Sequence, residues 1–251
     1  MPGHEPFDRC RRGLLVAGGA LTFAAALRPW RALAQPTGNA KLRIGVIGSG
    51  HIGGTIGGLW VKAGHPVLFS SRHPEELKDL VAGLGPLAQA GTVAQAIAFG
   101  DVLFVAVPYG ALPQIGKDNE AALKGKVVLD TCNPYVSRDG AMAQEALDKG
   151  TGVTDPVYLP GTRLVRAFSA VDATAVEASA EGRGERLAVP VAGDDRAAVD
   201  TAVQLVRDAG CEPLIVGDLA AARSFQRHGP GFRANTNLEK LRRLLGLADP
   251  A

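Results

Sequence analysis

A turn that is rich in glycine is the first feature of the sequence whose residue types and spacing point to chemistry. It directly follows an apolar run, residues 42–47, and directly precedes a helical pattern. Its residues are Gly48, Ser49, Gly50, His51, Ile52 and Gly53. In such a strand–turn–helix the glycines permit a tight turn, close approach of a pyrophosphate and close packing of helix on strand, and the helix N-terminus favours an anion. We therefore predict dinucleotide binding here; the alternative is a glycine turn with a structural role alone.

The end of the second apolar run, residues 66–69, bears on which dinucleotide this is. An NAD site usually places Asp or Glu about 20 residues after the first glycine, to hold the ribose 2′-hydroxyl. The chain has Ser71 and Arg72 there, and no carboxylate. A hydroxyl and a planar guanidinium suit a 2′-phosphate. The sequence favours NADP(H) over NAD(H), and a solvated turn arginine is the alternative.

Two later strand ends are candidates for the reacting end of the site, because ligands of open α/β sheets bind beyond the carboxyl ends of the strands. Tyr109 follows the apolar run 102–107, and Asn133 and Pro134 follow the run 127–130. Asn133 offers both donors and acceptors to a nicotinamide amide, and Pro134 stiffens the turn. We take Asn133, Pro134 and Tyr109 as candidates that line the nicotinamide site. An ordinary strand-end turn is the alternative, and no catalytic residue is assigned.

Missing motifs exclude some enzyme classes. Short-chain dehydrogenases need Tyr-x-x-x-Lys, but Pro113, Asp139 and Thr162 stand four residues after the three tyrosines. No His lies beside a Ser or Cys in a recognisable nucleophile setting. Hydride exchange between two carrier cofactors needs no strong general acid or base, since positioning of the two rings carries most of the work.

The elements that position these residues alternate between strand and helix. Apolar runs without polar alternation predict strands covered on both faces, and the order predicts a doubly wound, mostly parallel α/β sheet. Strands are expected at 42–47, 66–69, 87–89, 102–107, 127–130, 164–168, 187–191 and 213–216. Helices are expected at 52–63, 75–84, 93–98, 111–123, 141–149, 196–209, 219–223 and 238–247. Residues 177–186 are predicted to form a surface loop, and the last helical segment to cover the site or a partner subunit.

The N-terminal segment differs from the rest. Arg11 and Arg12 precede an uncharged run, 13–27, and a small-x-small site ends at Ala34. These parts predict a twin-arginine signal peptide at 1–34 and export to the periplasm, with no stable membrane span after cleavage; a retained anchor is the alternative. A linker at 35–40, a nucleotide-binding domain at 41–185 and a C-terminal α/β and helical portion at 186–251 are expected to follow.

Composition removes other classes of function. Basic residues number 27 and acidic ones 25, a balance without the basic excess of nucleic-acid binders. Three Cys and five His show no metal-ligand spacing, so no metal is expected. Cys132 and Cys211 are predicted to be buried free thiols.

Several segments in order resemble the family of F420-dependent NADP reductases. The segments are Ile44-Gly45-Val46-Ile47 with the glycine turn, Ser70-Ser71-Arg72, 130–134, Leu159-Pro160-Gly161, Val165-Arg166-Ala167-Phe168, Val191-Ala192-Gly193-Asp194-Asp195, Asp208-Ala209-Gly210 and Ala221-Ala222-Arg223. The resemblance implies a Rossmann NAD(P)-binding fold with a small C-terminal helical extension. It also implies hydride transfer between NADPH and the deazaflavin coenzyme F420, and commonly a homodimer.

By the same resemblance, Gly48 to Ile52 would bind the pyrophosphate and Ser71 and Arg72 the 2′-phosphate, with Val107, Pro108 and Asn133 near the nicotinamide. The chain departs from the family at Arg166, where Lys is frequent, and at Glu76, where Lys is common. Cytoplasmic domains of ferric reductases are similar too, so a flavin is a second candidate acceptor. The alternatives are a reductase of an imine or hydroxy acid, and a redox sensor that binds NADP without turnover.

Overall fold

The apolar runs of the sequence form the strands of one sheet. The computed structural model describes residues 41–248, and each predicted strand is present there, with bounds within two residues of those expected. The strands are β1 (Ile44–Ile47), β2 (Val67–Ser70), β3 (Ala88–Gly91), β4 (Val102–Val105), β5 (Val127–Asp130), β6 (Arg163–Ala167), β7 (Ala188–Gly193) and β8 (Glu212–Gly217). Residues 1–40, with the expected signal peptide and linker, lie outside the described residues.

The strand order places the predicted site residues on one edge. The order is β3-β2-β1-β4-β5-β6-β7-β8, and neighbours are parallel except β6 and β7, which are antiparallel. The chain crosses from β3 back over β1 to β4, which makes the β1–β4 boundary a topological switch point. The carboxyl ends of β1, β2, β4, β5 and β6 therefore meet at one edge. The predicted doubly wound, mostly parallel sheet is confirmed.

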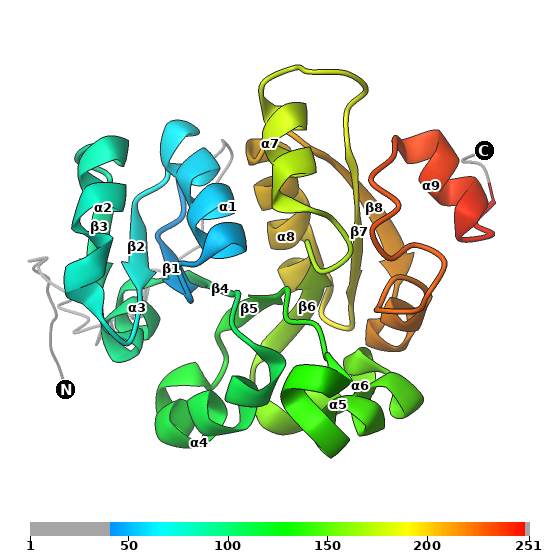
Figure 1. Ribbon diagram of the computed structural model, residues 1–251, viewed down its shortest axis with the longest axis horizontal. Coiled ribbons are helices and arrows are strands. Elements are labelled where there is room, and N and C mark those ends of the chain that lie inside the picture. The colour runs from blue at the N-terminus through cyan, green and yellow to red at the C-terminus, as the bar shows by residue number, and fades with distance from the viewer. Residues whose placement is uncertain (1–40, 249–251) are drawn as a thin grey trace, which may run out of the picture. The chain divides into compact units, whose positions relative to one another are not determined.

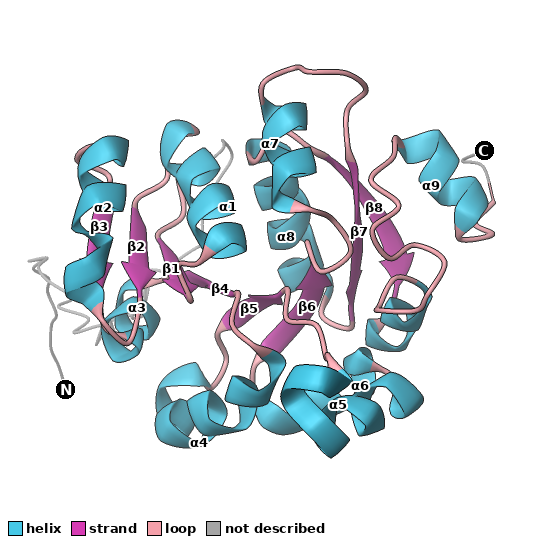
Figure 2. Cartoon of the chain, in the orientation of Figure 1, coloured by secondary structure: helices cyan, strands magenta, loops and turns pink. Residues whose placement is uncertain are grey.

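Helices cover both faces of this sheet (Figures 1 and 2). They are α1 (His51–Lys62), α2 (Lys78–Leu84), α3 (Val93–Phe99), α4 (Leu112–Leu123), α5 (Val136–Lys149), α6 (Thr151–Tyr158), α7 (Ala173–Ala180), α8 (Arg196–Asp208) and α9 (Leu238–Leu244), with 3-10 turns η1 (Pro74–Leu77), η2 (Tyr109–Ala111) and η3 (Leu219–Ser224). One large core joins α1, α7 and α8 to the sheet, and another joins α3, α4 and α5 to its other face.

Helix α1 forms despite its glycines because tertiary packing stabilises it. A Cβ at Gly57 would stand 2.5 Å from the Phe69 ring, so only glycine lets α1 approach β2 this closely. Trp60 is fully buried, and its indole N–H donates to the Leu205 carbonyl of α8 at 2.8 Å. The apolar contacts outweigh the low helix propensity of glycine, about 1 kcal/mol per residue. Helix α1, which follows the glycine turn, is thereby held rigidly on the sheet.

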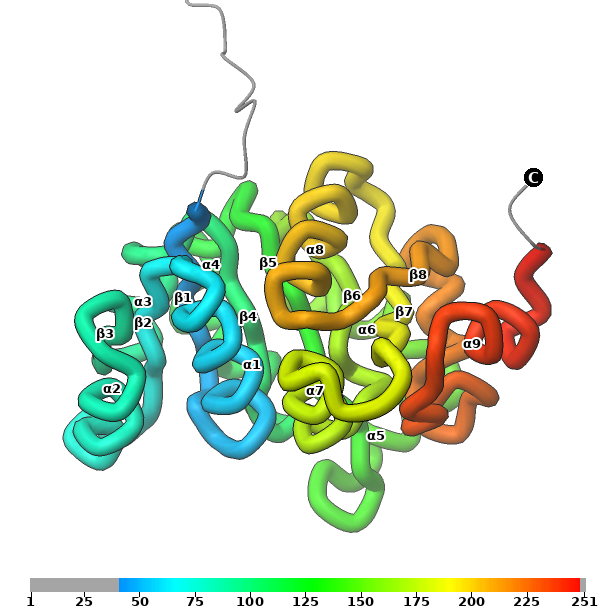
Figure 3. The backbone as a smooth tube through the Cα atoms, turned by 90° about the horizontal axis from the view of Figure 1, so that it is seen from above, coloured from blue at the N-terminus to red at the C-terminus, as the bar shows by residue number. Residues whose placement is uncertain are grey.

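The structure differs from the sequence predictions at three helices. Helix α6 is absent from the predicted helices, and it carries Pro156. A Cβ at its Gly152 would lie 1.7 Å from the Leu219 carbonyl oxygen, so α6 packs closely on η3. Helix α5 starts five residues earlier than expected, with a kink at Gly140 (φ +62°). Residues 177–180 belong to helix α7 and not to the expected surface loop. They are helical because Val176 is buried and α7 packs beside α1 (Figures 1 and 3). The surface loop therefore begins at Glu181.

The C-terminal portion continues the same fold. Strands β7 and β8 join the sheet across the expected boundary at residue 185, so the described residues form one compact unit. Leu241 of α9 packs with Ala188 and Leu214 on these strands, which places α9 on the far end of the sheet rather than over the predicted site. Both Cys132 and Cys211 are buried free thiols, as predicted. Among residues 41–248 no helix is long and apolar enough to cross a membrane.

Candidate functional site

The glycine turn after β1 has the close contacts that its motif predicts. Gly48 has φ +94°, and a Cβ there would lie 2.5 Å from the Ala106 carbonyl oxygen after β4. A Cβ at Gly53 would lie 1.9 Å from the Gly48 carbonyl oxygen. The first glycine is required by backbone conformation and the third by packing of α1 against the turn.

The middle of the turn is open on its outer side. Gly50 is exposed, and a Cβ there would meet nothing within 4 Å. Gly50 also caps α1 without a side-chain hydrogen bond, and no acidic residue lies in the first turn of the helix. The first backbone N–H groups of α1 are thus unclaimed by a capping side chain, and they face no carboxylate of their own helix. This arrangement fits a pyrophosphate.

The end of β2 lies against the glycine turn. Ser49 Oγ donates to the Ser70 carbonyl oxygen at 3.1 Å, and the Gly48 N–H donates to the same oxygen at 3.3 Å. Ser71 Oγ accepts from the His73 N–H at 3.1 Å. Arg72 is exposed, and within the described residues its guanidinium has no hydrogen bond or ion pair. A guanidinium of this kind at the end of β2 is available to a 2′-phosphate.

One carboxylate weakens the case for a 2′-phosphate beside Arg72. Glu76 of η1 is exposed and lines a cleft between α1 and α2 together with Ser49, Gly50 and His51. A carboxylate near a 2′-phosphate weakens its binding by like-charge repulsion, although solvent screens the effect at an exposed position.

The ends of β4 and β5 complete the edge. Val107 lies directly beside the glycine turn, since its Cγ1 would stand 2.7 Å from a Cβ at Gly48, and Pro108 is exposed next to it. The Thr131 N–H after β5 donates to the Val105 carbonyl oxygen at 3.1 Å. The structure therefore brings Val107, Pro108 and the turn at 131–134 to the same edge as the glycine turn.

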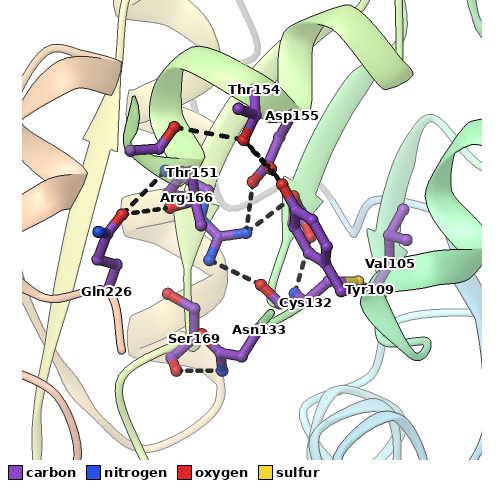
Figure 4. Close-up of polar contacts among 12 residues, drawn as sticks. Val105, Tyr109, Cys132, Asn133, Thr151, Thr154, Asp155, Arg166, Ser169 and Gln226 are labelled. Atoms are coloured by element: carbon purple, nitrogen blue, oxygen red, sulfur yellow. Dashed lines mark hydrogen bonds and ion pairs between the residues drawn. The ribbon is translucent and has the colours of Figure 1, made fainter. Parts of the chain in front are cut away.

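Four buried polar atoms near the ends of β5 and β6 lack partners among the described residues. They are Thr131 Oγ1, Asn133 Oδ1, Arg166 Nε and Ser169 Oγ. Asn133 and Ser169 lie side by side (Figure 4), and Asn133 Nδ2 donates to the Ser169 carbonyl oxygen at 2.7 Å. Buried polar groups nearly always have partners, so such a group of orphans points to a ligand or ordered water. An amide-bearing ligand would supply both a donor and acceptors.

The backbone is strained next to these unpartnered polar atoms. Phe168, immediately before Ser169, has φ +60°, which is uncommon for an aromatic residue. Its ring is fully buried and packs edge-on against Trp60 and Phe104, with both pairs of centroids 5.9 Å apart. Core packing thus holds the strained turn that presents Ser169.

The prediction that Tyr109 lines the site is wrong for this structure. Its side chain is fully buried, and its hydroxyl contacts Asp155 Oδ1 at 2.5 Å and Thr154 Oγ1 at 2.8 Å. Burial, followed by the nearby Asp155 carboxyl, holds the pKa of Tyr109 well above its usual range. The phenol is therefore a fixed donor inside the protein. Pro134 is also buried, so it shapes the turn rather than offering a ligand surface.

Behind this turn lies a buried ionic cluster that the sequence did not reveal (Figure 4). The Arg166 guanidinium contacts Asp130 Oδ2 at 2.8 Å and Asp155 Oδ2 at 2.9 Å, and the three side chains have no exposed surface. Burial raises the pKa of Asp155 well above its usual range. Burial also raises the pKa of the Cys132 thiol, which excludes Cys132 as a ready nucleophile. The sequence signal for this buried cluster is Arg166, a charged residue inside the otherwise apolar run 164–168.

Comparison with known proteins agrees with this geometry. Residues 43–134, from the start of β1 through the Asn133 turn, match the family described as NADP oxidoreductase, coenzyme F420-dependent. This segment of the chain is similar to the coenzyme F420-dependent NADP oxidoreductase family. The match contains the glycine turn, Ser71 and Arg72, and the strand ends at Val107 and Asn133.

A curated relative is similar to this chain beyond the segment 43–134. Metalloreductase STEAP3 of Rattus norvegicus is 29% identical over 188 residues, which is 73% of this chain but 36% of that protein. The chain thus spans about a third of the length of this curated relative.

Solved structures show the same fold. A hypothetical protein of Sinorhizobium meliloti aligns with a TM-score of 0.65 at 23% identity and covers 79% of this chain and 95% of its own. A candidate F420-dependent NADP reductase of Arthrobacter sp. FB24 aligns with a TM-score of 0.61 at 22% identity, covering 82% and 96%. An imine reductase variant of Myxococcus stipitatus aligns with a TM-score of 0.54 at 18% identity, covering 74% and 58%. The predicted Rossmann architecture is therefore shown.

Proposed function

We propose that this protein oxidises NADPH and transfers the hydride to a deazaflavin or flavin-like acceptor, or runs the reverse reaction. Support comes from the distribution of its polar groups along the carboxyl edge. The open Gly50 turn fits a pyrophosphate, and the Arg72 guanidinium, which has no partner among residues 41–248, fits a 2′-phosphate. The orphan atoms at Asn133 and Ser169 fit an amide-bearing ring.

The observation that carries the proposal is the placement of these groups on adjacent strands. Parallel strands lie about 4.8 Å apart. The order β2-β1-β4-β5-β6 therefore sets the residues proposed for the 2′-phosphate, the pyrophosphate and the carboxamide along one edge, in the order that an extended dinucleotide would need. When bound, NADPH supplies the hydride. The chain's own residues bind and orient it, and no described side chain at this edge has to act as a strong acid or base.

Two kinds of measurement test this proposal. Calorimetry should show binding of NADPH that is tighter than that of NADH. Stopped-flow absorbance at the nicotinamide band should then show oxidation of NADPH by deazaflavin, FMN or a ferric chelate. Binding without oxidation by any acceptor would refute the enzyme and support a redox sensor; tighter binding of NADH would refute the 2′-phosphate assignment.

The similarity to a metalloreductase makes ferric chelates the second acceptor class to assay. A cyclic imine and a β-hydroxy acid belong in the same assay, because a Rossmann fold alone does not select the substrate. Turnover of one of these in place of the deazaflavin would replace the acceptor named here.

We also propose export through the twin-arginine route and a homodimer. The signal residues 1–34 lie outside the described residues, and the proposal rests on their sequence. N-terminal sequencing of protein from the periplasmic fraction should begin at Gln35, whereas an intact N-terminus in a membrane fraction would identify an anchor. Light scattering during size exclusion should give twice the chain mass; the mass of one chain would refute the dimer.

A further inference from the structure

The buried Arg166 holds the backbone that carries Asn133. Its Nη2 donates to the Cys132 carbonyl oxygen at 2.8 Å, and its Nη1 pairs with Asp130. Asp130 Oδ1 in turn accepts the Cys132 N–H at 2.8 Å. One ion pair thus grips the Cys132 residue at both its N–H and its carbonyl group, and Asn133 is the next residue along the chain.

We propose that Arg166 is a positioning residue for the nicotinamide end of the cofactor, a role that rests on the proposed function. Through Cys132 it sets the direction in which Asn133 and its neighbours present their unpartnered polar atoms. Arg166 itself has no exposed surface and so touches no ligand. Its effect on hydride transfer is therefore indirect, through the orientation of the bound ring.

The first argument is the extent of the network behind this contact. Asp155 accepts from Arg166 at Oδ2 and from the Tyr109 hydroxyl at Oδ1. Tyr109 lies at the start of η2, Asp155 on α6 and Arg166 on β6. The network therefore ties three separate elements to the turn after β5, which leaves that turn little freedom to rotate.

The second argument concerns energy. Removal of two carboxyls and a guanidinium from water is costly, and an apolar cluster of the same volume often gives equal or greater stability. A network of this kind directly behind orphan polar atoms is better explained by orientation than by stability. Small errors of position matter there, because a displacement of about 1 Å costs roughly 100-fold in rate when orientation governs the step.

The third argument is the shape of the guanidinium. Arg166 uses one nitrogen for the two carboxyls and another for the Cys132 carbonyl oxygen. A lysine has a single nitrogen with three donors and no planar fork, so it cannot keep this geometry. Lysine at this position would retain the buried charge but release the Cys132 carbonyl.

The experiment compares Arg166→Lys with a control on the same strand. Arg163→Lys replaces an arginine that pairs with Asp195 at 2.7 Å near the surface, at the other end of β6. Three readouts are needed: affinity for adenosine 2′,5′-bisphosphate, which lacks the nicotinamide; the fluorescence of bound NADPH; and kcat and KM with the acceptor that wild type uses.

For Arg166→Lys we expect affinity for adenosine 2′,5′-bisphosphate within about twofold of wild type, because the glycine turn and Arg72 are untouched. The fluorescence of bound NADPH should shift toward that of the free cofactor, and kcat should fall by about 10- to 100-fold. Arg163→Lys should match wild type in all three. If wild type turns over no acceptor, the fluorescence of bound NADPH and the affinity for the bisphosphate still test whether Arg166 positions the nicotinamide.

Two outcomes would overturn the inference. One is an Arg166→Lys protein whose NADPH fluorescence and kcat equal those of wild type. The other is a parallel loss of affinity for adenosine 2′,5′-bisphosphate, which would show a general structural role. If Arg166→Lys does not fold, Asp155→Asn loosens the same network while keeping its shape, and the same readouts apply. A wild-type protein that binds no NADPH would instead refute the proposed function, and the inference with it.

Discussion

The Ser49 hydroxyl donates to the backbone carbonyl of Ser70 at 3.1 Å, which joins the glycine turn to the end of β2. The Ser70 hydroxyl in turn donates to the Val46 carbonyl oxygen at 2.8 Å, back on β1. The proposed pyrophosphate and 2′-phosphate positions are therefore held at a fixed separation by hydrogen bonds rather than by the strands alone.

Loss of this hydrogen bond should weaken dinucleotide binding as a whole. A typical hydrogen bond contributes about 0.5–1.5 kcal/mol, so Ser49→Ala should lower the affinity for NADPH and for NADH alike, by about 2- to 10-fold. Calorimetry with both nucleotides measures this. Thr201→Ala removes a similar bond from a hydroxyl to a backbone carbonyl on α8 and should leave both affinities unchanged. A loss confined to NADPH would contradict the explanation.

Replacement of Arg72 should change nucleotide preference. A hydrogen bond to a charged group contributes about 1.5–3 kcal/mol, so Arg72→Gln should weaken NADPH binding by about 10- to 100-fold and leave NADH binding almost unchanged. Arg183→Gln, which changes an exposed arginine paired with Glu181, is the matched control. Equal effects of Arg72→Gln on both nucleotides would show that Arg72 does not contact the 2′-phosphate.

Reversal of the charge at Glu76 should have the opposite effect. Glu76→Lys removes a carboxylate from the cleft beside Ser49 and His51 and adds a cation there, so NADPH binding should tighten several-fold at low salt. Because Glu76 is exposed, the gain should shrink as ionic strength rises. Titrations of NADPH at two salt concentrations check this, and a gain that is independent of salt would argue against an electrostatic cause.

Two glycine substitutions separate binding from stability. A Cβ at Gly50 meets no protein atom but would occupy the open side of the turn, so Gly50→Ala should keep the thermal stability and weaken NADPH binding more than tenfold. Gly83→Ala adds a Cβ to open space within α2 and should leave binding intact while stabilising the helix by about 0.5–1 kcal/mol. Thermal unfolding with and without NADPH gives both quantities. Unchanged binding by Gly50→Ala would place the pyrophosphate elsewhere.

The raised pKa of Asp155 should make the free energy of unfolding fall as pH rises. Burial raises the pKa of Asp155 in the folded state, so the folded protein holds a proton that the unfolded chain releases above about pH 4. This contribution is complete below the pKa of the unfolded chain and is lost as pH rises toward the folded value, at up to about 1.4 kcal/mol per pH unit. Asp155→Asn cannot titrate, so urea unfolding from pH 4 to about pH 8 should show a flatter profile.

Asp195 provides a control whose contribution to stability changes with pH in the opposite direction. Its hydrogen bonds with Arg163 lower the pKa of Asp195, so its contribution is present above the pKa of the unfolded chain and is lost as pH falls. Asp195→Asn should therefore remove stability at neutral pH and little in strong acid. Profiles of the same sign for the two variants would contradict the assignment of these pKa directions.

Much of the fold followed from local signals. Continuous apolar runs such as 127–130 indicated strands buried on both faces, and the glycine spacing at 48–53 indicated the turn that opens the nucleotide site. Thr92 and Gln95 form a capping box at the start of α3, a signal that is also local. By contrast, α6 contains Gly152 and Pro156 and has no local helix signal; it forms because it packs on η3.

The sequence by itself determined the strands, the glycine turn after β1 and the residues at the end of β2, because each depends on neighbours within a few positions. Only the tertiary structure decided that Tyr109 is buried, that Arg166 grips the Cys132 peptide through Asp130, and that Asn133 and Ser169 lie together. The physical reason is that these contacts join residues 34 to 46 positions apart, and burial and hydrogen-bond partners at such separations arise only when β5, η2, α6 and β6 pack together.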